Sequence, residues 1–182
     1  MDATQTAAKA PARPRMQIFR SEGVPLADDM MRPEPMTPAD TAAFEAAAQS
    51  GMHHGHQLVC LYRSPLPDGP SLCRMWLKGG FVTPRHRHDT NCIYYVLAGE
   101  LRLGNAVLAP NEGVFVPQGT VYSIEAGSAG LDVLEFRTDT VFNVEYTGND
   151  AGFWQHVSQA MTSNSPGWPD QPRPGWPEGR AR

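Results

Sequence analysis

The sequence predicts an all-β fold, a barrel or sandwich of short strands with one helix on each side of it. From Gln57 to Tyr146, short apolar or alternating runs are separated by turn signals rich in glycine, proline and asparagine, a pattern typical of all-β domains. Helical patterns stand only before and after this region. With 182 residues, of which 41% are hydrophobic, the chain is sufficient for one such core.

The first 36 residues are expected to form an extended or disordered arm. They show little periodicity, and they contain Pro11, Pro14, Pro25, Pro33 and Pro35, each of which would interrupt a helix. The segment 17–20, Gln-Ile-Phe-Arg, could add a strand to a sheet edge, including the edge of a partner subunit.

A helix is expected from Pro38 to about Ser50. Thr37 can cap it, Pro38 suits its first position, and Asp40 suits the positive end of its dipole. Gly51 would end it. The segment 53–56, His-His-Gly-His, follows as a turn that could chelate a metal, although we favour a solvated turn.

The strands are predicted from short β-like runs, and a tight turn at Gly104-Asn105 joins two of them as a hairpin. Another turn is expected at residues 127–130, Gly-Ser-Ala-Gly. One further strand carries the two histidines at 86 and 88. The other strands are expected at residues 57–63, 71–78, 91–98, 100–103, 106–109, 114–116, 121–126, 131–137 and 141–146.

A second helix is predicted from Ala151 to about Thr162, with an apolar stripe through Phe153, Val157 and Met161. The tail, residues 163–182, contains Pro-Gly-Trp-Pro twice, and this density of proline and glycine excludes regular structure. We expect its tryptophans to pack on the chain's own barrel or on that of a dimer mate. The barrel domain with its flanking helices would span residues 37–162.

The stretch Gly80–Gly99 contains the candidate site. His86 and His88 stand two apart in a β-like context, so their side chains point to one face of the strand. Imidazole is a common metal ligand, and two on one strand form a compact pair. Cys92 follows after a short polar break.

At these residues the sequence resembles the cupin family, whose first motif reads G-x5-H-x-H-x3-E-x6-G. Gly80, His86, His88 and Gly99 match this spacing, and Cys92 stands at the glutamate. The second motif, G-x5-P-x-G-x2-H-x3-N, is matched in part. Pro117 and Gly119 match its P-x-G. Asn111 stands at the first glycine, Tyr122 at the histidine and Ala126 at the asparagine.

The resemblance implies a cupin barrel, a double-stranded β-helix or jelly roll, with flanking N- and C-terminal helices. It also implies that His86, His88, Cys92 and Tyr122 converge inside the barrel. Cupins with intact motifs usually hold a transition metal through three histidines and a glutamate. With His86, His88 and Cys92 as ligands, a divalent zinc or iron ion is the metal expected here.

The resemblance favours a metal-binding cupin that acts on a small organic substrate, a dioxygenase-like oxidoreductase. Cys92 and Tyr122 would be the catalytic residues, Tyr122 as an acid/base or hydrogen-bond donor. Isomerase or lyase chemistry fits the same residues. The alternative is a non-catalytic small-ligand-binding or sensor cupin with a degenerate metal site. A third possibility is a site completed by Glu125, Asp89 or a histidine of segment 53–56.

Composition limits the partners. A net charge of −4 and a pI near 5.8 give no reason to expect a nucleic-acid partner, and no apolar run approaches the ~20 residues of a membrane span. The cysteines at 60, 73 and 92 form no close pair, which favours the reducing cytosol. A small-molecule ligand, a cytoplasmic location and a homodimer are therefore expected.

Overall fold

The computed structural model describes residues 16–20, 26–66 and 68–174, which form a barrel of two β-sheets with two helices at its side. The larger sheet has the order β2-β3-β8-β5-β6, and β7 pairs with β5. Its strands are β2 (His56–Arg63), β3 (Ser71–Leu77), β5 (Cys92–Leu103), β6 (Ala106–Leu108), β7 (Gly113–Val116) and β8 (Glu125–Arg137). The predicted all-β class with flanking helices is confirmed.

The smaller sheet has the order β1-β9-β4. Its strands are β1 (Met31–Pro33), β4 (His86–Arg87) and β9 (Phe142–Tyr146). β1 belongs to the described part of the predicted arm and pairs with β9 in parallel. Just before it, the short 3-10 helix Asp28–Met30 buries Met30 beside Cys73 and Phe142.

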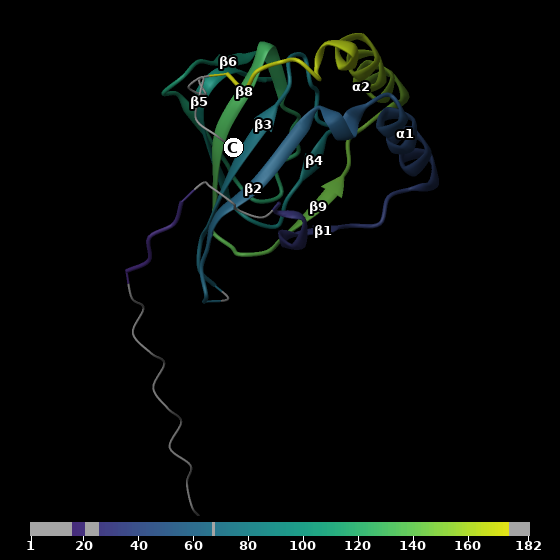
Figure 1. Cartoon of the computed structure of the whole chain (residues 1–182). Helices are drawn as coiled ribbons and strands as arrows, with labels where there is room; N and C mark the ends of the chain where they lie inside the picture. Colours follow the sequence, from purple (N-terminus) through teal and green to yellow (C-terminus); the bar gives the residue numbers. More distant parts are fainter. Residues whose placement is uncertain (1–15, 21–25, 67, 175–182) are drawn as a thin grey trace, which may run out of the picture.

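The helices α1 (Pro38–Gln49) and α2 (Ala151–Asn164) lie side by side next to the barrel, as the right-hand part of Figure 1 shows. Their predicted starts are confirmed. Thr37 Oγ1 accepts a hydrogen bond from the Asp40 amide at 3.1 Å, and Asp150 Oδ1 accepts one from the Phe153 amide at 2.8 Å. Two short 3-10 helices, Met52–His54 and Ser165–Gly167, follow α1 and α2.

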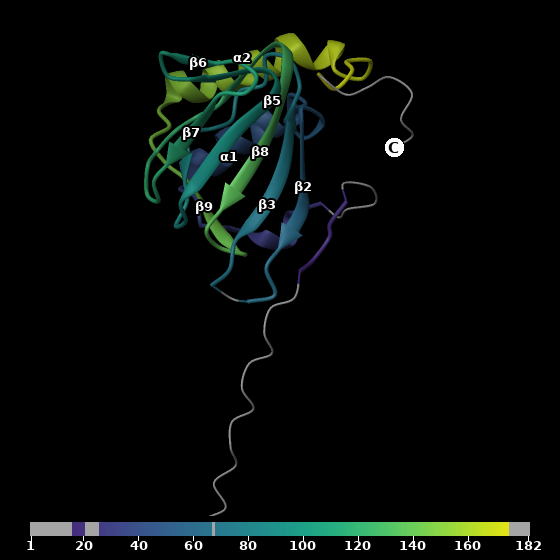
Figure 2. The same ribbon diagram turned by 90° about the vertical axis from the view of Figure 1, so that its left-hand side faces the viewer.

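The larger sheet presents alternate side chains to the interior. In β5, Cys92, Tyr94 and Val96 are buried, whereas Ile93 and Tyr95 are 44% and 42% exposed, as the period of a strand requires. Figure 2 shows β5, β8, β3 and β2 running side by side as one curved sheet. This alternation decides which residues can reach the site.

Three features of the strands differ from the prediction. Residues 91–98 and 100–103 form a single strand, β5, whose register shifts near Gly99. Gly99 has φ +78°, and a Cβ at this position would collide with the Gly130 carbonyl. β5 therefore needs glycine here, and it continues through a bulge where a turn was expected. The expected turn at 127–130 lies inside β8, and Tyr122 forms an isolated bridge where a strand was expected.

Other backbone predictions are confirmed or lie outside the described residues. The turn at Gly104-Asn105 joins β5 and β6. Asn111, at a motif glycine, has φ +73°, a conformation that asparagine tolerates better than most residues. Residues 17–20 form no strand in this chain. The start of the arm, residues 1–15, and the second Pro-Gly-Trp-Pro, from Gly175 onward, lie outside the described residues.

The described part of the tail packs on its own barrel. Trp168 is buried, and its indole N–H donates to the Gly79 carbonyl at 3.0 Å. Gly79 N–H in turn donates to Gln171 Oε1 at 2.8 Å. Within the described ranges, neither helix combines the length and apolarity needed to cross a bilayer.

Candidate functional site

His86 and His88 lie inside the barrel as neutral imidazoles. Each Nδ1 faces a backbone carbonyl, that of Pro84 at 2.7 Å and that of Asn143 at 2.5 Å. Burial lowers the pKa of both rings and, together with the charge of Arg137, brings that of His88 to about 2. With Nδ1–H donating to the carbonyl, Nε2 of each ring remains as an acceptor.

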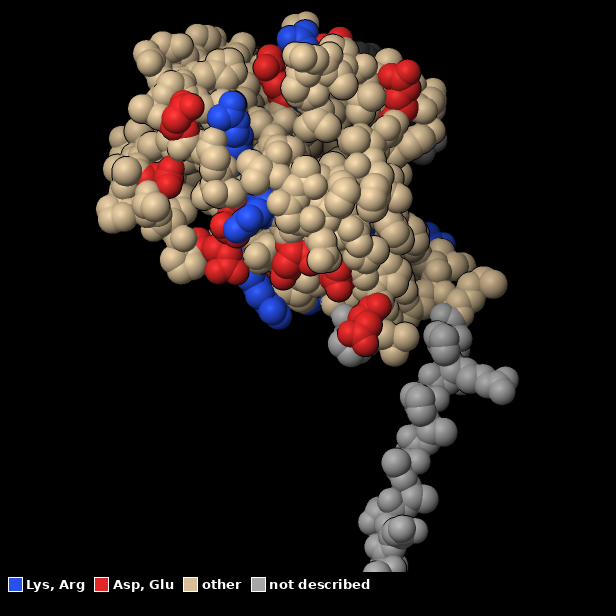
Figure 3. Space-filling model, turned by 180° about the vertical axis from the view of Figure 1, so that it is seen from behind, with Lys and Arg blue, Asp and Glu red and all other residues tan. Residues whose placement is uncertain are grey.

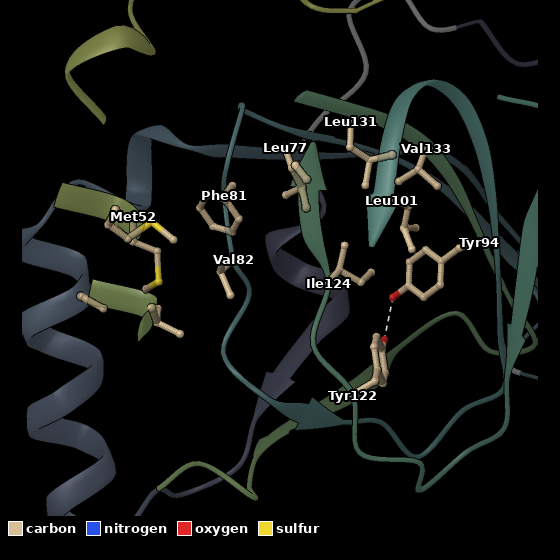
Figure 4. Close-up of a cluster of buried hydrophobic side chains, with 14 of the residues drawn as sticks. Met52, Leu77, Phe81, Val82, Tyr94, Leu101, Tyr122, Ile124, Leu131 and Val133 are labelled. Atoms are coloured by element: carbon tan, nitrogen blue, oxygen red, sulfur yellow. Dashed lines mark hydrogen bonds between the residues drawn. The ribbon is translucent and has the colours of Figure 1, made fainter. Parts of the chain in front are cut away.

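Tyr122 lies directly beside these histidines, as the resemblance implies. Its backbone exchanges two 3.0 Å hydrogen bonds with His86, and the two rings are 4.6 Å apart. Its hydroxyl lies 2.6 Å from that of Tyr94, the pair joined by the dashed line in Figure 4. Tyr94 donates to Glu135 Oε1 at 2.8 Å, so Tyr122 must be the donor to Tyr94.

Glu135 and Arg137 form a buried ion pair through Arg137 Nη2 and Glu135 Oε1. The register of β8 and β5 places Glu135 opposite Tyr94 and Arg137 opposite Cys92. Both charged side chains are only 2% exposed. The inner face of β5 and β8, together with Tyr122 from the segment before β8, therefore holds a polar cluster, which we call the barrel network: Cys92, Tyr94, Tyr122, Glu135 and Arg137.

Cys92 belongs to this network as a protonated thiol. Its Sγ lies 3.7 Å from Glu135 Oε1. Burial, and then the charge of Glu135, raise the pKa of the thiol. The residue lies behind the carboxylate and is not among those that line the cavity. Its predicted roles as a ligand and a catalytic group stay predictions.

A cavity of about 540 Å³ opens into the barrel beside the network. Its polar end is formed by His86, His88, Tyr94, Glu135 and Arg137. The rest of the wall is mainly apolar. It comes from β1, β2, β3, β9, α1, the 3-10 helix Met52–His54 and the segments before β1, β4 and β8. Its apolar residues are Leu26, Met31, Phe44, Met52, Leu58, Met75, Leu77, Phe81, Pro84, Ile124, Phe142, Val144 and Tyr146. Figure 4 shows Leu77, Phe81 and Ile124 between the helices and the tyrosine pair.

Sequence reasoning did not find the roles of Tyr94, Glu135 and Arg137. The run 131–137 alternates leucine, valine, glutamate and arginine with aspartate, leucine and phenylalanine, so both faces look half apolar. In the structure, Glu135 and Arg137 point inward with Val133, whereas Phe136 is 41% exposed. The signal that could have found them is a pair of opposite charges two apart in a strand that also buries valine.

The other metal candidates are placed apart from the network. Asp89 Oδ1 accepts a hydrogen bond from the Asn143 amide, and Glu125 pairs with Arg102 at 3.3 Å on the surface. His53 and His56 line the cavity near its outer part. No group of three or more His, Cys, Asp or Glu side chains in the described part of the chain is arranged to hold a metal.

The polar end of the cavity does not fit a tightly held metal ion. Two imidazoles are available, but Glu135 is already occupied by Arg137 and Tyr94. Arg137 Nη2 also lies 3.4 Å from His88 Nε2, so a metal on that nitrogen would meet a positive charge at close range. The barrel therefore lacks a complete set of free metal ligands, and the guanidinium of Arg137 is already present there as a cation.

The comparisons give structural likeness without sequence relatives: no family model and no curated protein matches the chain. KdgF from a Halomonas species is 22% identical with a TM-score of 0.41, covering 46% of this chain and 79% of that one. An RmlC-like cupin from Shewanella frigidimarina is 18% identical with a TM-score of 0.41, covering 46% and 76%. The polyketide cyclase RemF from Streptomyces resistomycificus is 18% identical with a TM-score of 0.48, covering 60% and 83%. Likeness at this level concerns the fold and carries neither substrate nor reaction.

Proposed function

We propose, starting from a chain with the cupin fold, that the barrel binds a small organic molecule in the cavity beside the barrel network. The sequence predicts either a metal-dependent oxidoreductase or a non-catalytic ligand-binding protein, and this proposal is the second of them. The molecule would lie along the apolar wall with its polar group at His86, His88 and Arg137.

The observation that carries this proposal is the composition of the cavity. It has about 540 Å³ of volume, an apolar wall and polar groups gathered at one end. Sites for small organic molecules have this size and this distribution of polar groups. Small barrels of this kind have room for one such ligand.

A metal-dependent enzyme, the dioxygenase-like oxidoreductase predicted from the sequence, is the second candidate. The observation that favours it is the pair of histidines, whose Nδ1 atoms are held by carbonyls, which leaves Nε2 of His86 without a hydrogen-bond partner in the described residues and Nε2 of His88 facing Arg137 at 3.4 Å. Zinc or iron on His86, His88 and Cys92 stays a prediction. Elemental analysis of wild-type protein beside the double variant His86→Ala/His88→Ala tests it, because a metal held there is lost in the variant.

The ligand-binding proposal predicts that the neutral fluorescent dye N-phenylnaphthylamine binds inside the barrel. Leu58 lines the cavity, so Leu58→Trp should fill the cavity and abolish binding. Val59→Trp is the matched control, because this neighbouring residue of β2 does not line the cavity. The measurement is a fluorescence titration of wild type and both variants at pH 7.

Equal loss of dye binding in both variants would mean that the dye reports disturbed packing instead of the cavity. The absence of dye binding to wild type would remove the proposal. If the double variant His86→Ala/His88→Ala keeps dye binding and metal is found only in wild type, both candidate functions stand together at one site.

The homodimer and the cytoplasmic location stay predictions. An outward-facing apolar row crosses the larger sheet, where Ile93 lies opposite both Phe115 and Phe136, and these side chains are 41–58% exposed. A second copy could cover this row.

On the face seen in Figure 3, acidic and basic side chains are interspersed among uncharged ones.

A further inference from the structure

The guanidinium of Arg137 is a buried cation at the polar end of the cavity. Its Cζ lies 3.6 Å over the ring of Phe142, and Nη2 lies 3.4 Å from His88 Nε2. Nη2 is also the nitrogen paired with Glu135. The cation is thus held from one side by a carboxylate and over its face by an aromatic ring.

Arg137 has donor capacity that its surroundings do not use. Its Nε and Nη1 atoms are buried and find no hydrogen-bond partner in the described residues. A buried donor without an acceptor destabilises the folded protein, and more so when it is charged. The side chain lines the cavity, which makes a ligand bound there the candidate for the missing acceptor.

We propose, on the basis of the ligand binding proposed above, that Arg137 takes the place of a metal ion as the resident cation of this barrel and anchors the carboxylate of a small organic acid. Guanidinium suits a carboxylate because both are planar and their hydrogen bonds are charge-assisted. The acid's apolar body would lie against Met75, Leu77 and Ile124, which line the same cavity.

The other groups at this end carry no charge that competes for the anion. Burial raises the pKa of the Tyr94 and Tyr122 hydroxyls, and each imidazole is engaged through Nδ1 with a backbone carbonyl. Glu135 already shares the guanidinium, so a bound carboxylate would be the second on one arginine. The affinities of a carboxylate and of the neutral amide of the same shape show whether attraction by Arg137 exceeds repulsion by Glu135.

Displacement of N-phenylnaphthylamine by naphthoate and by naphthamide tests the proposal. We expect naphthoate to bind roughly tenfold more tightly, the effect of one charge-assisted hydrogen bond. In Arg137→Lys, which keeps the charge but loses the planar donors, the preference should fall. Arg87→Lys is the control, because Arg87 lies outside the barrel and pairs with Glu145 at 2.7 Å.

Equal affinity of wild type for the acid and the amide would overturn the proposal, as would failure of naphthoate to displace a bound dye. A preference that disappears when EDTA is added would also overturn it, because a metal would then be the anchor. The wild-type comparison decides the charge preference even where Arg137→Lys does not fold. Failure of the dye itself to bind is a different result and refutes the ligand-binding proposal.

Discussion

Glu135 and Arg137 neutralise each other inside the barrel, and the pair is surrounded by groups that stay uncharged. Tyr94 donates to the same carboxylate oxygen that pairs with Arg137. Removing either charged partner leaves the other buried without compensation, which is far more costly than removing both.

A double-mutant cycle tests this residue-scale coupling. We expect Glu135→Gln and Arg137→Met each to lower the free energy of unfolding by about 3–5 kcal/mol. The double variant should lose less than the sum of the two and no more than the worse single variant. Urea unfolding at pH 7 measures all four proteins.

The exposed pair Arg87–Glu145 is the matched control, because it has two hydrogen bonds of 2.7 Å but lies at the surface. The same substitutions there should cost much less. Additive losses in the buried cycle would mean that Glu135 and Arg137 stabilise the barrel independently.

Half of the site could be predicted from the sequence at this scale. The resemblance implies that His86, His88, Cys92 and Tyr122 converge. In the structure Cys92 lies beside the Glu135 carboxylate, Tyr122 reaches it through Tyr94, and His88 lies beside Arg137. The roles of these residues stay predictions. The carboxylate itself could not be predicted, because the face that a strand buries depends on its neighbours when both of its faces are half apolar.

At the scale of elements, α1 and α2 are joined through Asp40. Its carboxylate accepts hydrogen bonds from Trp154 Nε1 at 2.8 Å and from Thr37 Oγ1 at 2.7 Å. The bond from Trp154, and then that from Thr37, lower the pKa of Asp40. The same carboxylate therefore supports the helix start and the contact between the two helices.

Asp40→Asn should lower the free energy of unfolding by about 1 kcal/mol at pH 7. Because the folded protein holds the pKa of Asp40 below its unfolded value, the ionised form is the stabilising one. Its contribution is complete above about pH 4 and is lost as the pH falls through the lower, folded-state pKa. Urea unfolding of wild type and variant from pH 7 to pH 3 should show the difference shrinking only in the acid range.

Glu45→Gln is the control, since it removes an exposed acidic side chain from the same helix. A difference between wild type and Asp40→Asn that stays constant down to pH 3 would show that the charge of Asp40 contributes nothing.

The helices were predictable because their signals are local, whereas the long strands were not. Thr37 and Asp150 cap the helices that immediately follow them. In contrast, β5 and β8 continue through Gly99 and residues 127–130 because each bulges against the other. Glycines in such strands look like turns when the partner strand is unknown.

At the scale of the whole molecule, the C-terminal tail closes over the barrel from outside. Trp168 packs on Phe81, with 5.9 Å between ring centroids, and Lys78 Nζ donates to the Trp168 carbonyl at 2.6 Å. Arg173 adds two hydrogen bonds of 2.9 and 3.0 Å to Asp132. The composition of the tail predicts no regular structure, and the 3-10 helix Ser165–Gly167 corrects this prediction. The surface that Trp168 covers is defined only by the folded barrel.

This packing predicts that the described tail stabilises its own chain. Trp168→Ala should lower the free energy of unfolding by about 3–5 kcal/mol, the usual cost of removing a buried tryptophan. Trp168→Phe should cost less, because it loses the hydrogen bond to Gly79 but keeps most of the ring contact with Phe81. Asp170→Ala, at an exposed position two residues further on, is the control.

Thermal unfolding at several protein concentrations separates two arrangements of the tail. A loss that is independent of concentration agrees with a tail folded on its own barrel, and a loss that grows on dilution would mean that Trp168 packs on a second copy.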